Sequence, residues 1–307
     1  MGVSANPVPL HLLSAEQMPH APRTPPHARW QWLGSDTEER FGKRPHPTLG
    51  PEAVQYRFNA HGYRCAEFDV PRDGAVTVIA LGASEVLGTG LPADKTFCAE
   101  FARRLGERLG RPAIYWNLGA GGSSADYIAR MLASALPVLR PDVALFSFPH
   151  PARREHLSDD GRIHLHNREG PGGKKFAERL MDPEKFMLKQ SNMNLSSEAN
   201  DTMNLYKNYK VCELLCAEHS TMWLFSATRD AFLEPIARHL DVARWVRPGI
   251  GDLKSNSSDD EGLALARDMQ HPGIGPHSEM AERLLAQLEA CDGERLRALA
   301  RAAPVAV

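Results

Sequence analysis

The chain has 307 residues, of which 42% are hydrophobic, and its formal net charge at pH 7 is −2. This length and apolar fraction suit one large globular domain or two small ones with a filled core. The near-zero charge gives no reason to expect a nucleic-acid partner. No apolar run approaches the ~20 residues that cross a membrane, so no membrane partner is expected either.

Five cysteines are spread along the chain. Cys212 and Cys216 are four residues apart on an expected helix and could share one face. No second cysteine pair accompanies them, as a zinc site would require. We therefore expect no metal, and we interpret the thiols as reduced core residues of a cytoplasmic protein.

Residues 1–50 are expected to form an N-terminal arm ahead of the main domain. Residues 1–30 are rich in Pro and His without a period, which is typical of a flexible or wrapping segment. Trp30 and Trp32 are expected to anchor this arm onto the body. The first residues lack a basic stretch followed by a long apolar one, so we do not expect a secretory signal.

The first clear strand ends in a serine turn. Thr77–Leu81 is an apolar run of strand length, which breaks at Gly82 and places the hydroxyl of Ser84 just past the break. Such a serine sits at the carboxyl edge of a sheet, where open α/β sheets bind ligands. It can act as a nucleophile if a base reaches it, although an ordinary turn serine would leave the same pattern.

Helices and strands alternate after this turn. Asp94–Leu109 carries an apolar stripe at helical spacing, and Ala113–Leu118 reads as a strand. Ser123–Leu136 reads as a helix ended by prolines, and Asp142–Phe148 as a third strand. This alternation predicts an α/β fold, a three-layer sandwich with a parallel sheet between two layers of helices.

Residues from about 151 to 220 interrupt that rhythm. We expect them to form an insertion over the serine edge of the sheet, either a lid or a substrate-binding cap; the alternative is an oligomer contact. Strict alternation in Arg162–His166 predicts a small β-hairpin. Its two histidines could hold a metal, but a solvated strand face explains them better, because two ligands fall short of a usual set. Phe176–Leu188 and Asn204–Glu218 look helical.

The sheet then resumes. Thr221–Ser226 is the expected fourth strand and Val242–Val246 the fifth. Lys254–Glu261 is rich in Ser, Asn and Asp and is expected to be a mobile loop. Ser278–Ala290 is the closing helix, with an inward apolar face.

A carboxylate and an imidazole lie close together before the closing helix. Asp268 stands three residues before His271. The Asp can accept a hydrogen bond from one ring nitrogen and leave the other free to take a proton from a serine. A lone Asp-x-x-His is a weak signal. Together with the strand-end serine, Ser84, it indicates a catalytic triad.

These segments resemble the blocks of a known family, the SGNH (GDSL-type) hydrolases. The first family block reads Gly-Asp-Ser-x-x-x-Gly, and residues 82–88 read Gly-Ala-Ser-Glu-Val-Leu-Gly. The second reads roughly Asn-x-Gly-x-x-Gly, and residues 117–122 read Asn-Leu-Gly-Ala-Gly-Gly. The last, Asp-x-x-His-Pro, matches residues 268–272. The blocks follow the family's order and, with their surroundings, cover about residues 76–150 and 264–290.

The resemblance implies a flavodoxin-like SGNH hydrolase fold over residues 51–307, with about five parallel strands. It implies a serine hydrolase that cleaves a small-molecule carboxylic ester through an acyl-enzyme. Ser84 would attack, His271 would act as the general base and Asp268 would orient the histidine. The N–H groups of Ser84 and Gly122 would hold the oxyanion. No metal or organic cofactor is implied, and an oligomer is possible.

Two positions depart from the family pattern. Ala83 stands where the family usually has Asp. The third family block, Gly-x-Asn-Asp, should follow the strand that ends at Phe148, but residues 149–152 read Pro-His-Pro-Ala. The position of the family's oxyanion-hole asparagine falls at about Pro151, and proline has no donor.

Two nearby side chains could replace the missing donor. His150 and Arg153 can both donate hydrogen bonds, so we expect one of them to point into the Ser84 site. A cation there would also favour a substrate that carries a carboxylate or phosphate. The alternative is that both merely pair with acidic neighbours such as Glu155.

Other functions stay open at this stage. An acyltransferase or a thioesterase would use the same triad, and a non-catalytic binding module on the same fold would explain the missing Asn. The order Ser, Asp, His also fits α/β-hydrolases. Their serine turn reads Gly-x-Ser-x-Gly, whereas Val86 stands at the last of those positions here, so we favour the SGNH interpretation.

Overall fold

The computed structural model describes residues 25–157, 163–167, 197–257 and 262–301. The expected helix Phe176–Leu188 and most of the expected N-terminal arm before Trp30 lie outside these residues. The expected loop Lys254–Glu261 lies within them only in part.

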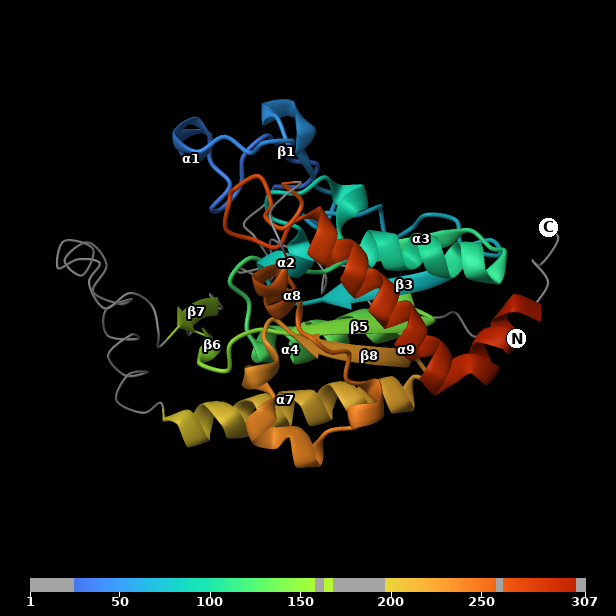
Figure 1. Cartoon of the computed structure of the whole chain (residues 1–307). Helices are drawn as coiled ribbons and strands as arrows, with labels where there is room; N and C mark the ends of the chain where they lie inside the picture. The colour runs from blue at the N-terminus through green and yellow to red at the C-terminus, as the bar shows by residue number, and fades with distance from the viewer. Residues whose placement is uncertain (1–24, 158–162, 168–196, 258–261, 302–307) are drawn as a thin grey trace.

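A parallel sheet of four strands forms the centre of the molecule (Figure 1). Its order is β4 (Ala113–Asn117), β3 (Val76–Leu81), β5 (Val143–Phe148), β8 (Met222–Ala227). In chain order this is the 2-1-3-4 arrangement of doubly wound, flavodoxin-like sheets. The predicted α/β class with a central parallel sheet is therefore confirmed.

The expected fifth strand, Val242–Val246, is wrong. Val242–Arg244 forms a 3-10 turn, η6, and only a single parallel bridge joins Phe225 to Trp245. The main-chain N–H of Val246 also bonds to the carbonyl of Phe225 at 2.8 Å. The chain meets the edge of the sheet here and then turns away. Val242–Val246 therefore has the apolar pattern of a strand but does not form a ladder of hydrogen bonds with β8.

Helices cover both faces of the sheet. Figure 1 shows α3 (Phe97–Leu109) and α9 (Ile274–Arg301) on one face, and α4 (Ala125–Leu139) and α7 (Glu198–Glu218) on the other. Because successive strand side chains point to opposite faces, β3 serves two cores. Val76, Val78 and Ala80 pack towards α3 and α9, whereas Ile79 and Leu81 pack towards α4 and α7.

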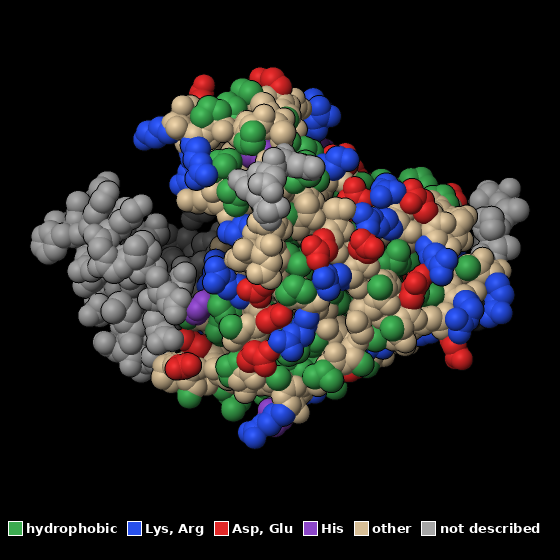
Figure 2. Space-filling model, in the orientation of Figure 1, with side chains coloured by type: hydrophobic (Ala, Val, Ile, Leu, Met, Phe, Trp, Pro, Cys, Tyr) green, Lys and Arg blue, Asp and Glu red, His purple; other side chains and the backbone are tan. Residues whose placement is uncertain are grey.

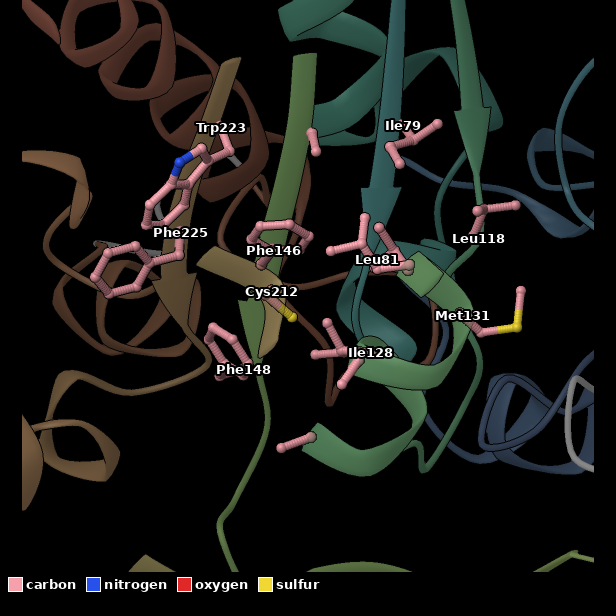
Figure 3. Packing of buried hydrophobic residues seen from close by; sticks show 14 of the residues in the cluster. Ile79, Leu81, Leu118, Ile128, Met131, Phe146, Phe148, Cys212, Trp223 and Phe225 are labelled. Atoms are coloured by element: carbon pink, nitrogen blue, oxygen red, sulfur yellow. The ribbon is translucent and has the colours of Figure 1, made fainter. Parts of the chain in front are cut away.

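The core on the α4 side is rich in aromatic residues. Ile128 and Met131 of α4 belong to this core; in Figure 3, Ile128 lies near Leu81 of β3 and Phe148 of β5, and Cys212 of α7 lies beside Phe146 and Phe148. The aromatic ring of Phe148 packs against Phe225 edge-on, with ring centroids 6.4 Å apart. Burial of such side chains is the main term that holds the helices to the sheet.

The boundaries of α3 and α4 differ from those expected, and α7 and α9 are longer than expected. Asp94 lies in a short 3-10 turn, η3 (Ala93–Lys95), so α3 begins only at Phe97. Helix α4 continues through Pro137 to Leu139, because its apolar side stays buried against the sheet and offsets the hydrogen bond that proline cannot make.

The segment that interrupts the rhythm has two different parts. Strands β6 (Arg153–Leu157) and β7 (Ile163–Asn167) form an antiparallel hairpin, as predicted. Helix α7, in contrast, packs along α4, with Tyr209 and Cys212 buried in the core. The expectation that the whole segment lies over the serine edge is therefore wrong for α7, which is part of a helical layer.

The described N-terminal residues pack onto the body, at the top of Figure 1. Strand β1 (Arg29–Trp30) pairs with β2 (Tyr56–Arg57), and a short helix, α1 (Glu38–Lys43), follows. The Trp30 ring packs edge-on against Phe58, and the Arg267 guanidinium lies 4.0 Å over the Trp32 ring. Both tryptophans thus anchor this segment, as expected.

Short helical elements follow β8 in the described residues before α9. They include the 3-10 turns η4 (Asp230–Phe232) and η5 (Glu234–His239) and the helix α8 (Ile250–Asn256). Lys254 lies in the last turn of α8. The predicted start of the mobile loop at Lys254 is therefore wrong. Among the described residues, no helix combines the length and the apolarity that a membrane span needs.

Candidate active site

Ser84 stands where β3 turns into the short helix α2 (Ser84–Leu87). The turn is possible because residue 82 is glycine. A Cβ there would lie 2.4 Å from a methyl carbon of Val86 and 2.9 Å from the carbonyl oxygen of Ser147. The close packing of these three elements puts the Ser84 hydroxyl at the carboxyl edge of the sheet, as the sequence predicts.

Asp268 and His271 reach the same edge from the far end of the chain. Their loop closes on itself, because Ala266 donates its N–H to the carbonyl of His271 at 3.0 Å. It is tied to the chain after α2 by the bond from Arg267 N–H to Gly90 O at 2.9 Å. A Cβ on Gly90 would come within 2.9 Å of Ala266, so only glycine allows this approach.

The three polar side chains form one hydrogen-bonded line. His271 Nε2 lies 2.8 Å from Ser84 Oγ, and His271 Nδ1 lies 2.6 Å from Asp268 Oδ2. The second carboxylate oxygen of Asp268 accepts the main-chain N–H groups of Gln270 and His271, each at 3.0 Å. The structure thus brings together the residues that the spacing singled out.

The carboxylate of Asp268 is held in its charged form. Burial by itself would raise its pKa, but hydrogen bonds and charge from His271, together with the hydroxyl of Ser35, outweigh burial and bring the pKa well below its usual range. A charged carboxylate only accepts hydrogen bonds. Nδ1 of His271 is therefore the donor in its bond to Asp268, and in the neutral ring Nε2 carries a lone pair that can accept from the Ser84 hydroxyl.

Ser35 is a site residue that sequence reasoning missed. Its hydroxyl donates to Asp268 Oδ2 at 2.6 Å and lies 3.4 Å from His271 Nδ1. No motif marks a serine in a polar N-terminal segment, so the sequence carries no signal for this contact.

A buried ion pair fixes that segment beside the site. The guanidinium of Arg267, which is fully buried, meets Asp36 through two bonds, Nε to Oδ1 at 3.0 Å and Nη2 to Oδ2 at 2.6 Å. The Tyr56 hydroxyl donates to the same carboxylate at 2.6 Å and accepts the N–H of Gly90 at 2.7 Å. Asp36 follows Ser35 and Arg267 precedes Asp268, so this ion pair holds Ser35 and Asp268 close to each other.

The second block lies against the serine turn. Asn117 at the end of β4 donates its side-chain N–H to Val86 O at 2.7 Å, and the Ser123 hydroxyl donates to Gly82 O at 2.8 Å. Gly122 has a positive φ of 77° and is exposed. Among the described residues, neither the N–H of Gly122 nor that of Ser84 has an acceptor.

A pocket of about 350 Å³ opens at Ser84 and His271. His150 and Arg153, the two side chains expected to replace the missing asparagine, both line it. His150 Nδ1 accepts the N–H of Ala152 at 3.1 Å, so its ring proton is on Nε2. The remaining lining residues come from four segments: Glu85, Thr228, Arg229, Phe232, Gly251, Lys254, Gln270 and Pro272.

The expected alternative partner of His150 and Arg153 is occupied elsewhere. Both oxygens of Glu155 accept from Arg130, Oε2 from Nε at 3.0 Å and Oε1 from Nη2 at 2.9 Å. Glu155 thus forms a two-bond pair with Arg130 and does not draw Arg153 away from the pocket.

The side chains of the two histidines in β7 lie outside the described part of the structure. Among the residues that the structure describes, no three His, Cys, Asp or Glu side chains lie close enough together to hold an ion. Cys212 and Cys216 are buried in the core, and burial raises the pKa of the Cys216 thiol to about 12. A thiol this hard to ionise is a poor metal ligand and a poor nucleophile.

No protein-family model and no curated protein sequence matches this chain. Several solved structures are similar to it. TesA is 14% identical with a TM-score of 0.43, over 70% of this chain and 98% of TesA. A lipolytic protein of the G-D-S-L family from Desulfitobacterium hafniense is 11% identical, with a TM-score of 0.36 over 69% and 99% of the two chains.

A third similar structure is a two-domain esterase (CEX) active on acetylated mannans. It is 13% identical with a TM-score of 0.43, over 76% of this chain and 53% of the esterase.

Proposed function

We propose that the protein is a serine esterase of the SGNH type. Ser84 Oγ attacks the acyl carbon of the ester, and His271 Nε2 takes the serine proton and then delivers it to the leaving alcohol. Asp268 holds the ring in the required tautomer and stabilises the imidazolium. Water then hydrolyses the acyl-enzyme by the same route in reverse.

The observation that carries this proposal is the 2.8 Å contact between His271 Nε2 and Ser84 Oγ at the edge of a pocket. A serine becomes a nucleophile only when a base lies within hydrogen-bond reach. The His271 side chain is 21% exposed, so a substrate and a water molecule can both approach it. This access favours a catalytic role over a binding module with a sealed serine.

Developing charge on the substrate oxygen needs donors in place beforehand. The main-chain N–H groups of Ser84 and Gly122, which have no acceptor among the described residues, are suited to this task. In place of the family's asparagine, the third donor would be His150 Nε2 or the Arg153 guanidinium, both of which line the pocket.

The experiment is active-site labelling combined with turnover. A fluorophosphonate probe should label the wild-type protein at Ser84, and p-nitrophenyl esters of varied chain length should be hydrolysed. Ser84→Ala should lose labelling and hydrolysis, whereas the control Ser134→Ala, on α4, should keep labelling and hydrolysis. Failure to label Ser84 would favour the binding module. If an added alcohol or thiol acceptor receives more acyl groups than water does, the protein is an acyltransferase that uses the same residues.

A further inference from the structure

Cationic side chains outnumber acidic ones in the lining of the pocket at Ser84. Arg153, Arg229 and Lys254 all line it, and they come from β6, from the loop after β8 and from α8. Glu85 is the one acid among the described lining residues. In Figure 2, Lys and Arg side chains gather beside the hollow below the N-terminal segment. Three cationic side chains and one carboxylate thus line a small pocket.

Glu85 is bonded to hydroxyl groups and not to these cations. Its side chain is buried, with 4% of the residue exposed. Oε1 accepts from the Ser147 hydroxyl at 3.1 Å and from the Thr228 hydroxyl at 3.0 Å. The carboxylate thus has hydroxyl partners of its own.

The nearby acids that could neutralise the arginines are paired with other cations. Asp230 forms an ion pair with Arg247 at 3.2 Å, and Asp126 forms one with Arg154 at 3.4 Å. Within the part of the chain that the structure describes, the guanidinium groups of Arg153 and Arg229 have no ion-pair or hydrogen-bond partner. Arginines beside a reactive serine are therefore left with their donors open.

Lys254 adds a third charge whose geometry is set. Its ammonium group donates to the carbonyl of Gln270 at 2.9 Å, next to His271 in the sequence. An ammonium group has three donors, and this bond uses one of them. The contact holds the charge at the rim of the site and leaves donors for a ligand.

We propose that this pocket binds an anionic group, a carboxylate or a phosphate, carried by the ester that Ser84 attacks. The inference rests on the proposed esterase function and specifies its substrate class. Guanidinium groups match carboxylate and phosphate oxygens through paired hydrogen bonds. Convergence of Arg153 and Arg229 beside the serine makes them specificity-determining residues.

The test compares charged and neutral esters of the same shape. On the acyl side the pair is 4-nitrophenyl hemisuccinate and 4-nitrophenyl methyl succinate. On the alcohol side it is 4-acetoxybenzoate and its methyl ester. In at least one pair we expect the charged ester to have a kcat/KM about tenfold higher or more, since a charge-assisted hydrogen bond contributes roughly 1.5–3 kcal/mol. Added salt should reduce this preference.

The variants assign the preference to residues. Arg153→Gln and Arg229→Gln should each reduce the charged-to-neutral ratio of kcat/KM about tenfold. The matched control is Arg297→Gln, an exposed arginine near the far end of α9. This variant also removes one positive charge, and it should leave kcat/KM unchanged for the charged and for the neutral esters.

Two outcomes separate this inference from the proposed function. If neutral esters are hydrolysed through Ser84 but neither pair favours the charged ester, or the ratio survives both arginine variants, the anion site is refuted and the esterase stands. If no ester is hydrolysed, calorimetric titration with succinate and with inorganic phosphate decides. Binding of either one that Arg153→Gln and Arg229→Gln abolish supports the site and identifies the anion, and absence of binding overturns it.

Discussion

The hydroxyl of Ser35 donates a 2.6 Å hydrogen bond to Asp268, although the two residues are 233 positions apart in the chain. The same carboxylate oxygen is bonded to His271 Nδ1 at 2.6 Å. Ser35 therefore helps to hold the acid that orients the histidine, and the N-terminal segment forms part of the candidate active site.

Removal of the Ser35 hydroxyl should slow turnover without weakening substrate binding. We expect Ser35→Ala to lower kcat about tenfold with little change in KM, because a hydrogen bond to a charged group contributes about 1.5–3 kcal/mol. Steady-state kinetics measure the split. Ser35→Thr retains the hydroxyl and should recover most of the rate. A rise in KM at constant kcat would contradict the positioning role.

The three residues in line should differ in their effects on turnover. Ser84→Ala and His271→Ala should each remove most ester hydrolysis, while circular dichroism and the unfolding midpoint stay close to wild type. Asp268→Asn should be equally or less damaging, because Asp268 orients His271 and does not touch the substrate. Near-normal turnover in Ser84→Ala or His271→Ala would contradict the proposed triad mechanism.

The third oxyanion donor should be revealed by substitutions that remove a donor and keep the shape. His150→Phe keeps a ring against Phe232, whose centroid lies 4.7 Å from that of His150, and Arg153→Met keeps a long side chain without a donor. In at least one variant we expect kcat to fall about 10²-fold, the usual effect of losing an oxyanion donor. Normal kcat in both would show that neither side chain replaces the missing asparagine.

The ion pair between Asp36 and Arg267 should be a major determinant of stability. Both side chains are buried, so Asp36→Ala would leave a buried guanidinium without its counter-charge. Breaking such a pair costs about 3–5 kcal/mol of unfolding free energy, which urea denaturation can measure. Glu279→Gln, which breaks an exposed pair with Arg283, should change stability little. Equal effects of the two substitutions would show that the buried pair has no special weight.

Stability should fall in mild acid because of His277. Burial, with a smaller contribution from His271, lowers the pKa of His277 to about 3, and its Nδ1 accepts the N–H of Phe97 at 2.9 Å. Between about pH 6.5 and pH 3 the unfolded chain binds a proton that the folded chain does not. The free energy of unfolding should therefore drop by about 1.4 kcal/mol per pH unit in this range.

From pH 7 to pH 5 this amounts to roughly 2 kcal/mol for the one group. Asp268, whose pKa is depressed, loses its contribution only below about pH 4. His277→Asn keeps an acceptor for the Phe97 N–H and should flatten the pH dependence. An NMR titration provides a direct check: the His277 ring should stay neutral down to pH 4. A ring that titrates near pH 6.5 would contradict the prediction.

Short-range chemistry explains what could be predicted from the sequence. The β-branched run before Gly82 favours a buried strand, and the glycine is required because no Cβ fits against Val86. Asp268 and His271 are close in sequence, so their hydrogen bond is a local property of one loop. The α/β class and the candidate residues Ser84, Asp268 and His271 follow from patterns within a few residues of each other.

Tertiary packing decided the rest. Val242–Val246 has the apolar pattern of a strand, but pairing needs a free sheet edge along its length, and the chain turns away after one bridge. The apolar side of α7 could belong to a lid or to the core, and the sequence does not distinguish the two. Contact with α4 places it in the core.

The positions of Ser35 and of the pocket's cations also depend on tertiary packing. The sequence by itself identified the candidate nucleophile Ser84, the candidate base His271 and the strand that presents the serine, because each is marked by a pattern of local spacing. Only the folded chain determined that Ser35 reaches Asp268 and that Arg229 and Lys254 join Arg153 at Ser84. Contacts between residues tens to hundreds of positions apart depend on how whole elements pack, and no periodicity in the chain encodes them.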